Sequence, residues 1–370
     1  MKRLSIALSF IICHLSFSIA QTQLSEYRPG MTQEGLVYFL PKTAIRVSVL
    51  VEKTTYQPGD FARYAQRYLR LSDVSQQPST TCRVVDVSQT AVAVADTTKG
   101  FAVKFDIRSI AAQAQLSSDG CLLAINTDPV APVAQPEPFQ PAPQRPMLNP
   151  RELMGEEILT AGSTAKMAEL TAQEIYDLRE NRSLLIKGQA EFNPKDGEQL
   201  KVMLRELDDQ ERALSSLFRG VTTIDTTEYV IWMTPAAPVN RQVLFRLSQT
   251  EGMVDSDDLS GDPFYITVED LHTVPPVDPI LAAQAKKKKV EAGIYVNVPG
   301  RMRVTILEGI NPLLELESPA SQFGRTLLLS GSLFNKRYTT RLRLNALTGA
   351  LEQLDADQPK KTFVLFPKKQ

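Results

Sequence analysis

Residues 163–188 read STAKMAELTAQEIYDLRENRSLLIKG, and residues 196–220 read DGEQLKVMLRELDDQERALSSLFRG. Each stretch begins with a residue that can cap a helix, Ser163 or Asp196, continues with apolar side chains at helical spacing, and ends at a glycine. Only a short loop separates the two stretches. The sequence therefore predicts an antiparallel αα-hairpin whose apolar stripes bury each other or a sheet.

Strand patterns flank this hairpin on both sides. Apolar and polar residues alternate in the run FAVKFDI at residues 101–107, which is typical of half-buried strands. The same pattern predicts strands at residues 45–52, 82–87, 91–95, 121–126, 229–233, 243–247 and 264–268, with a turn at residues 96–100. One short helix, capped by Asp60, is expected to dock Phe61, Tyr64 and Tyr68 on a sheet.

Proline-rich and lysine-rich stretches divide the chain, because proline cannot donate to a ladder of hydrogen bonds. We predict an α+β fold with β-rich N- and C-terminal modules, built as sandwich-like antiparallel sheets, around the central αα-hairpin. The predicted segments are a signal peptide at 1–20, an N-terminal β-rich domain with one short helix at 21–128, a linker at 129–150, the hairpin plus strands at 151–274, a second linker at 275–292 and a C-terminal β-rich domain at 293–370.

The two strand-rich ends share a short likeness. Residues 35–41 read GLVYFLP and residues 293–299 read GIYVNVP, and each run precedes β-branched residues. Either a degenerate internal repeat or a chance match explains this likeness.

The charge balance excludes one large class of function. The 370 residues carry 41 Lys and Arg against 42 Asp and Glu, so no basic surface is offered to nucleic-acid phosphates. Only two histidines occur, which leaves most zinc sites without ligands. We therefore expect no nucleic-acid partner, no metal and no cofactor.

The N-terminus predicts export. Lys2 and Arg3 precede an apolar run that closes on the small residues before Gln21, as in a signal peptide cleaved after Ala20. No later segment is apolar for the eighteen or so residues that a spanning helix needs. The mature chain is expected to be soluble, not integral to the membrane, and periplasmic or associated with the outer membrane, in an oligomeric state that the sequence does not determine.

Cys82 and Cys121 remain after cleavage, in a compartment where an oxidised pair persists. A disulfide between them is the preferred interpretation. The alternative is two separately buried thiols, since sequence fixes neither their separation nor their orientation.

Three other motifs have ordinary structural explanations. Ser163 and Lys166 have the spacing of an acylating serine and its lysine, but the companion motifs are absent and Ser163 already fits a helix cap. The acidic residues of 255–262 do not follow the calcium-loop spacing and suit a solvated turn. His272 has no partner motif and is expected at the surface. No catalytic residue is named.

Two Asp-Thr-Thr triplets, at residues 96–98 and 225–227, resemble acceptor sites of periplasmic O-glycosylation in Bacteroides-type bacteria. Thr97 and Thr226 are the candidate glycosylated residues. Because the triplet is short, chance recurrence is the alternative.

Several runs together carry a resemblance to a known family. They are YFLP at 38–41, EKTTYQPG at 52–59, EIYDLRE at 174–180 and DG at 196–197 ahead of QE at 210–211. The chain resembles the exported family called Domain of Unknown Function 4831, and the likeness covers most of the mature chain. The resemblance implies a Gram-negative, Bacteroides-type cell envelope and carries over no catalytic residue.

Two functions remain open at this point. The first is a non-catalytic binding or scaffolding protein of the cell envelope, with a protein or glycan partner that contacts the hairpin, because no nucleophile–base pair or phosphate loop is visible. The second is a hydrolase of envelope glycan or peptide that uses two carboxylates, which leaves no motif in a single sequence. A cleft with two acidic side chains would favour the hydrolase.

Overall fold

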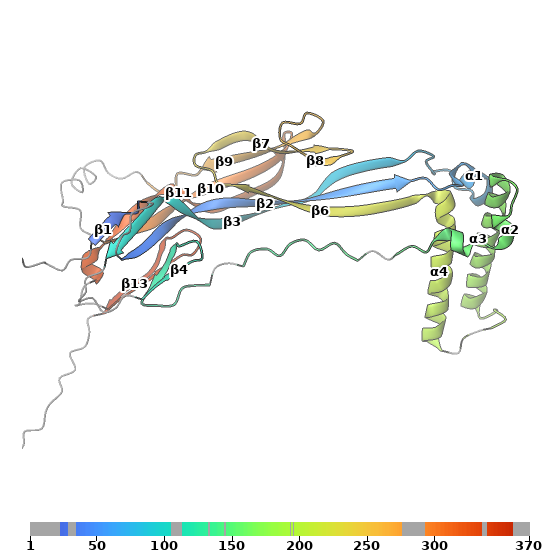
Figure 1. The fold of residues 1–370 in the computed structure, drawn as a ribbon, viewed down its shortest axis with the longest axis horizontal. Coiled ribbons are helices and arrows are strands. Elements are labelled where there is room, and N and C mark those ends of the chain that lie inside the picture. Colours follow the sequence, from blue (N-terminus) through green and yellow to red (C-terminus); the bar gives the residue numbers. More distant parts are fainter. Residues whose placement is uncertain are drawn as a thin grey trace, which may run out of the picture.

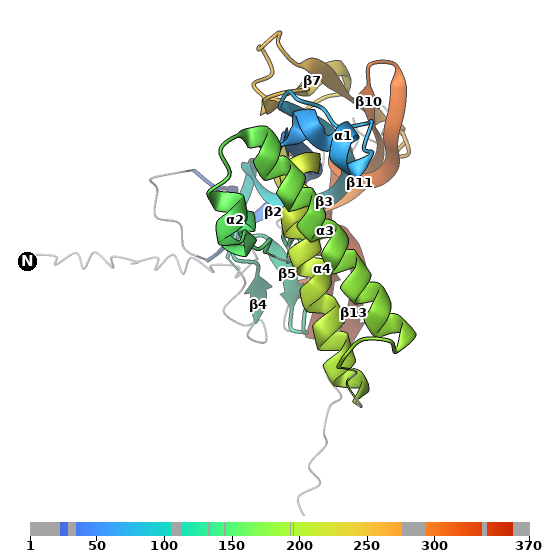
Figure 2. The ribbon, with the colours of Figure 1, turned by 90° about the vertical axis from the view of Figure 1, so that its right-hand side faces the viewer.

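The computed structural model describes residues 23–28, 35–104, 113–131, 134–143, 146–192, 194, 196–275, 293–334 and 339–357. The molecule is elongated: three β-sheets lie at one end, a group of helices lies at the other, and three long paired strands join the two ends (Figure 1). Figure 2 views the molecule from the helical end. The mostly antiparallel sheets and the central helix pair confirm the predicted α+β class.

The first sheet forms the long axis of the molecule. Its strands, in the order β1-β3-β2-β6, are antiparallel. They are β1 (Gln23–Glu26), β2 (Leu36–Gln57), β3 (Ser79–Lys104) and β6 (Val221–Met233). The 22 residues of β2 span roughly 70 Å at about 3.3 Å per residue. This sheet therefore reaches from the other two sheets to the helices.

The second and third sheets cover one end of the first. The second has the order β11-β10-β9-β7-β8, from β7 (Val239–Ser248), β8 (Gly252–Val254), β9 (Asp262–Asp270), β10 (Gly293–Glu308) and β11 (Asn311–Ser330). The third has the order β13-β12-β5-β4, from β4 (Ala114–Leu116), β5 (Leu122–Ile125), β12 (Thr339–Leu344) and β13 (Leu351–Asp357). The 3₁₀ turn η3 (Gly331–Phe334) follows β11.

The first and second sheets pack face to face as a sandwich. Alternate β2 residues point into its core, because successive strand side chains face opposite sides. The buried side chains are Ile45, Val47, Val49, Val51, Cys82, Phe245, Leu247, Phe264, Ile266, Val268, Met302, Val304, Ile306 and Ala320. Each large apolar side chain buried in this way contributes about 1.5–3 kcal/mol.

A second core lies where the third sheet meets the other two, and Tyr38 is fully buried there. Its hydroxyl accepts a hydrogen bond from the Tyr295 backbone N–H at 2.8 Å and donates to the Tyr295 carbonyl at 3.2 Å. Burial raises the pKa of Tyr38 above its ordinary range. The two bonds satisfy a polar group that would otherwise be costly to bury.

The sheets cross the predicted segment boundaries, which corrects the division of the chain into separate β-rich domains. β5, from the N-terminal segment, pairs with β12 from the C-terminal segment. β6 follows the hairpin but pairs with β2 over its whole length. Buried backbone N–H and C=O groups need hydrogen-bond partners, and a segment remote in sequence can supply them. Strands from different predicted segments therefore complete the same sheets.

The turn predicted at residues 96–100 is instead an irregularity inside one strand. Phe39 pairs with Gly100 and the next β2 residue, Leu40, pairs with Asp96, so residues 97–99 bulge out of β3. The strands predicted at 82–87 and 91–95 are likewise parts of β3. These turn-forming residues therefore form a bulge in β3, and the chain continues in the same direction after it.

The helical end comprises the 3₁₀ turns η1 (Ala62–Tyr64) and η2 (Pro150–Leu153) and the helices α1 (Ala65–Leu69), α2 (Glu156–Leu159), α3 (Thr164–Lys187) and α4 (Gly197–Arg219). We call this group the head. Ser163 and Asp196 cap α3 and α4 as predicted. Asp60 does not cap α1; it lies exposed and pairs with Arg151. The aromatic side chains near it pack against other helices instead of a sheet.

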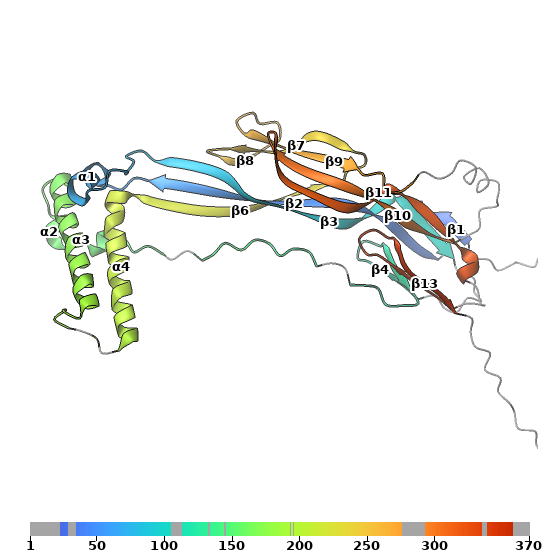
Figure 3. The ribbon, with the colours of Figure 1, turned by 180° about the vertical axis from the view of Figure 1, so that it is seen from behind.

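The proline-rich stretch has no helix or strand in its described part between β5 and η2. It runs beside the long axis from the third sheet to the head (Figure 3). Six prolines within it remove backbone donors, which accounts for the extended course. The second predicted linker lies almost entirely outside the described residues, as does the signal peptide.

The two similar runs occupy equivalent places in the fold. The Phe39 N–H donates to the Gly120 carbonyl at 3.0 Å, and the Asn297 N–H donates to the Gly349 carbonyl at 3.0 Å. Each acceptor glycine has a positive φ and precedes a residue that forms an isolated parallel bridge. These shared contacts favour an internal repeat over a chance match.

Candidate functional site

Within the head, the hairpin of α3 and α4 lies across the long axis of the molecule (Figures 1 and 2). Arg179 pairs with Glu211 at 2.6 Å and Arg182 with Asp208 at 2.6 Å, which ties the two helices together side by side. All four side chains are partly exposed, so each pair contributes at most about 1 kcal/mol. Apolar packing must supply most of the stability of the head.

The apolar core of the head is separate from the sandwich core. It is formed by Phe61, Ala65, Leu69, Met154, Ile158, Ala168, Ala172, Ile175, Leu178, Leu214, Leu217 and Phe218. All six α4 side chains that are buried lie at residues 213–218, next to the long strands. The outer part of α4 therefore has no buried side chain among its described residues.

This outer part of the hairpin exposes apolar side chains. Ile186 is 58% exposed, Phe192 63% and Val202 60%. A pair of helices buries one stripe from each helix, so residues outside these stripes stay in water unless a third element covers them. We call the outer hairpin, residues 179–212, the hairpin tip.

Close backbone contacts join the head to the strands. The Phe61 N–H donates to the Leu217 carbonyl at 2.7 Å, and a Cβ on Gly59 would lie 2.2 Å from the same oxygen. The Tyr56 hydroxyl contacts the carbonyls of Ser75 and Arg219 at 2.8 and 3.0 Å. These contacts fix where the head sits on the strands.

A groove of about 580 Å³ lies where β3 passes the ends of the second sheet. Its apolar lining comes from Val84 and Val87 of β3, Leu247 of β7, Phe264 of β9 and Leu313 of β11. Leu247 and Phe264 also belong to the sandwich core, so the groove opens directly beside that core. An extended peptide or a small ligand has room there.

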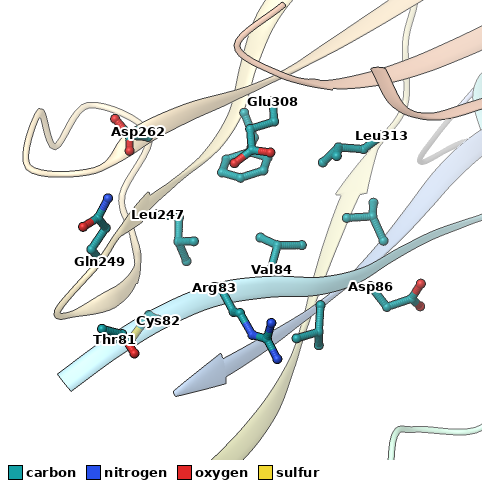
Figure 4. Close-up of a pocket in the computed structure, with 13 residues that line it drawn as sticks. Thr81, Cys82, Arg83, Val84, Asp86, Leu247, Gln249, Asp262, Glu308 and Leu313 are labelled. Carbon is teal, nitrogen blue, oxygen red and sulfur yellow. The ribbon is translucent and has the colours of Figure 1, made fainter. Parts of the chain in front are cut away.

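Three carboxylates surround this groove. Asp86 lies on β3, while Asp262 and Glu308 lie on the opposite side (Figure 4). All three residues are exposed, and among the described residues none forms a side-chain hydrogen bond or ion pair. No group of acidic, His or Cys side chains in the described part of the chain is placed to hold a metal ion. The groove therefore combines apolar side chains with three carboxylates, and its one basic lining residue, Arg83, pairs with Glu52 at 2.7 Å.

Glu228 of β6 holds the proline-rich stretch against the long strands. Its carboxylate accepts hydrogen bonds from the Ser48 hydroxyl at 2.5 Å, the Arg46 guanidinium at 3.1 Å and the Phe139 backbone N–H at 2.7 Å. The bonds from Ser48 and Phe139 are the main reason why the pKa of Glu228 lies below its ordinary value. The Glu228 carboxylate is held by these three hydrogen bonds, so it is better suited to anchoring the proline-rich stretch than to transferring a proton.

The Ser163–Lys166 pair is structural. The Ser163 hydroxyl accepts the Lys166 backbone N–H at 3.2 Å, and the Lys166 ammonium bonds Glu169 at 2.9 Å. A lysine held by a carboxylate one turn further on is not positioned to activate the serine.

The acidic loop and His272 also match their structural explanations. Asp258 accepts the Ser260 N–H at 2.9 Å, which lowers the pKa of Asp258 and closes the turn. His272 is exposed; its Nδ1 lies 3.1 Å from Asp270 Oδ2, and its backbone N–H donates to Asp270 Oδ1 at 2.8 Å. Neither contributes to a catalytic cluster.

The structure contradicts the predicted disulfide. Cys82 and Cys121 are both buried and both free. Cys82 lies opposite Lys53 of β2, whereas Cys121 forms a bridge with Phe39 of β2. Phe39 and Lys53 are fourteen residues apart along that strand. That separation is roughly 45 Å along β2, and a disulfide requires Cα atoms within about 7 Å. Two separately buried thiols are correct.

The candidate glycosylation residues lie in different surroundings. Thr97 is exposed in the β3 bulge, and Thr226 is half-buried on β6, opposite Glu52 of β2. Thr97 is therefore the more accessible of the two to a modifying enzyme. The modification itself stays a prediction.

The comparison with known proteins settles the family. A family model described as a domain of unknown function, DUF4831, matches residues 34–352. The chain belongs to the DUF4831 family. No curated protein and no solved structure matches it. None of the helices in the described part of this DUF4831 member is long and apolar enough to cross a membrane.

Sequence reasoning did not find the groove of this DUF4831 member. Asp86, Asp262 and Glu308 come from strands that are far apart in the chain, and no local motif links them. Only the packing of β3 across the second sheet brings them to one opening. The hairpin, in contrast, was visible from its caps and apolar spacing.

Proposed function

We propose that this protein is exported and acts in the cell envelope as a non-catalytic binding or scaffolding protein that presents its hairpin tip to a partner. The observation that carries the proposal is the long sheet, which holds the head well away from the sandwich (Figure 1). A stiff three-stranded spacer has no use in a compact enzyme but suits the presentation of a surface at a distance.

The surface chemistry of the tip supports a protein partner ahead of a glycan. Ile186, Phe192 and Val202 offer apolar area, and exposed apolar area concentrates at protein contact sites. The described part of the tip contains no tryptophan or tyrosine, the flat side chains on which sugar rings stack.

A photo-crosslinking amino acid at Val202 tests this proposal in intact cells. The matched control carries the same group at Leu259, which is 82% exposed but lies in a turn of the sandwich. We expect one reproducible protein adduct from position 202 and none from position 259. The adduct should disappear when Ile186→Glu is added, and circular dichroism should not change because Ile186 is exposed. Equal adducts from both positions would contradict the proposal.

Export is proposed from the N-terminal sequence and is tested separately. Fractionation and mass spectrometry of the native protein should find it outside the cytoplasm and beginning at Gln21. An intact chain in the cytosol would remove the envelope role.

A second candidate function rests on the groove. The three carboxylates at one opening include candidates for the two acidic side chains that a hydrolase of envelope glycan or peptide would use. Nothing in the described chain orients them through hydrogen bonds, which makes this candidate weaker. Release of soluble fragments from purified cell-wall material, lost in Asp262→Asn and in Glu308→Gln, would favour the hydrolase.

A further inference from the structure

The edge of β3 beside the groove lacks a strand partner. β1 pairs only with residues 101–104 of β3, and the Cys82 N–H donates to the Gln249 carbonyl at 2.7 Å. Between these points no described strand pairs with the outer edge of β3. Unpaired strand edges are the sites where an additional extended segment binds, because its backbone completes the ladder.

The groove lies at the start of this edge and suits a segment of defined chemistry. Val84, Val87 and Leu313 would contact an apolar side chain, and Asp86, Asp262 and Glu308 would face basic flanks. The one basic residue of the lining, Arg83, is already paired with Glu52. A matching occupant is therefore an apolar, β-prone segment with lysine or arginine on both sides.

This chain contains such a segment. Residues 358–370 read QPKKTFVLFPKKQ and lie outside the described residues. The run TFVLF, in which four of five residues have strong strand preference, stands between two pairs of lysines, with no acidic residue. Residues 276–292 also contain a lysine run, but alanine and lysine dominate them and they lack aromatic residues.

The segment does not reach the groove of its own chain. β13 ends at Asp357 and runs toward the end of the molecule opposite the head (Figures 1 and 3). The third sheet meets β2 at Phe39, whereas Asp86 at the groove pairs with Leu50, eleven residues and roughly 36 Å further along. The six residues from Asp357 to Phe363 extend at most about 22 Å.

We propose that residues 362–366 of a second copy of this chain bind as an added strand along the β3 edge, with an aromatic side chain in the groove. The flanking lysines of that copy then face Asp86, Asp262 and Glu308. The contact joins two different surfaces, the groove of one copy and the basic C-terminal segment of the next. Such a heterologous contact generates a closed ring or an open filament. This inference does not depend on the hairpin tip.

Light scattering over a range of protein concentrations tests the assembly. The chain from Gln21 to Gln370 should increase in mass with concentration, whereas the chain ending at Asp357 should remain a monomer. Equal masses at every concentration would overturn the proposal. Because the deletion removes only residues outside the described fold, circular dichroism of the two chains should agree.

A labelled peptide of residues 358–370 tests the site on the shortened chain. We expect saturable binding, no binding when the peptide carries Phe363→Asp and Phe366→Asp, and binding about tenfold weaker to the Glu308→Lys chain. A peptide with Lys368→Glu and Lys369→Glu should recover part of the affinity for that variant. Equal binding of a scrambled peptide with the same lysines would show general charge attraction and overturn the proposal.

Backbone methylation distinguishes an added strand from a side-chain contact. In a strand, alternate N–H groups point to the partner and away from it. One peptide carries N-methyl groups at residues 363 and 365, and a second carries them at residues 362 and 364. We expect one of the two peptides to lose binding and the other to keep it. Equal affinities for the two peptides would exclude the ladder.

Discussion

The same strands are buried at one end of the molecule and exposed at the other. Residues 43–49 of β2 are all buried, whereas residues 53–56 are half-buried or exposed although they keep both strand neighbours. Hydrogen-bonded pairing therefore continues far beyond the core that stabilises it. The head needs a core of its own at the far end, and it has one.

This contrast predicts that the two cores unfold separately. Phe218→Ala in the head should cost about 3–5 kcal/mol and Ile266→Ala in the sandwich about 2–5 kcal/mol, because each removes a fully buried side chain. Helical circular dichroism reports on the head, and the single tryptophan, Trp232 of β6, reports on the sheet. Phe218→Ala should shift the helical transition alone. Coincident shifts of both signals would show one cooperative unit.

The junction between the two regions is the next most sensitive place. A Cβ on Gly59 would lie 2.2 Å from the Leu217 carbonyl oxygen, so Gly59→Ala should destabilise the head by about 1–3 kcal/mol. Gly162→Ala is the matched control, because nothing lies within 4 Å of its added methyl group. Chemical denaturation followed by circular dichroism measures both. An unchanged midpoint for Gly59→Ala would mean that the junction moves freely.

A smaller effect is expected inside the head. Ser163→Ala removes the cap of α3 and should lower helix stability by about 0.5–2 kcal/mol. Ser183→Ala, in the interior of the same helix, should be neutral or slightly stabilising. If the two variants have the same unfolding midpoint, the cap contributes nothing.

The attachment of the proline-rich stretch to the long sheet should depend on pH. The pKa of Glu228 is lowered in the folded state, so its bonds stabilise the protein above the ordinary value of 4.5, and this stability is lost as the pH falls through the folded value. Glu228→Gln should therefore make the acid-induced loss of stability shallower, and Ser48→Ala should act in the same direction. Trp232 fluorescence during denaturation at several pH values provides the measurement. Identical pH profiles for Glu228→Gln and the wild type would contradict this role.

Reductant should have no effect on either region. Cys82 and Cys121 are free and far apart, so the unfolding midpoints of the chain from Gln21 should be equal with and without a thiol reductant. Burial raises the pKa of Cys121, so its alkylation should be slow in the native protein and complete after denaturation. A midpoint that falls in reductant would revive the disulfide.

Local sequence patterns determined the two long helices of the head, α3 and α4, almost completely. The caps at Ser163 and Asp196 and the glycines at 188 and 220 bound α3 and α4 where the structure has them. Helix starts, stops and apolar faces depend on residues within a few positions of each other, so they are readable from the chain alone. Strand positions were readable for the same reason, through alternation at period two.

Tertiary structure alone decided which strands share a sheet, that residues 96–100 bulge instead of turning, and that the cysteines stay apart. It also assembled the groove, where β3 meets the ends of β7, β9 and β10. Strand edges accept any segment that completes the backbone ladder, however distant in sequence, and the choice among segments is made by the packing of whole sheets. No short-range pattern encodes that choice.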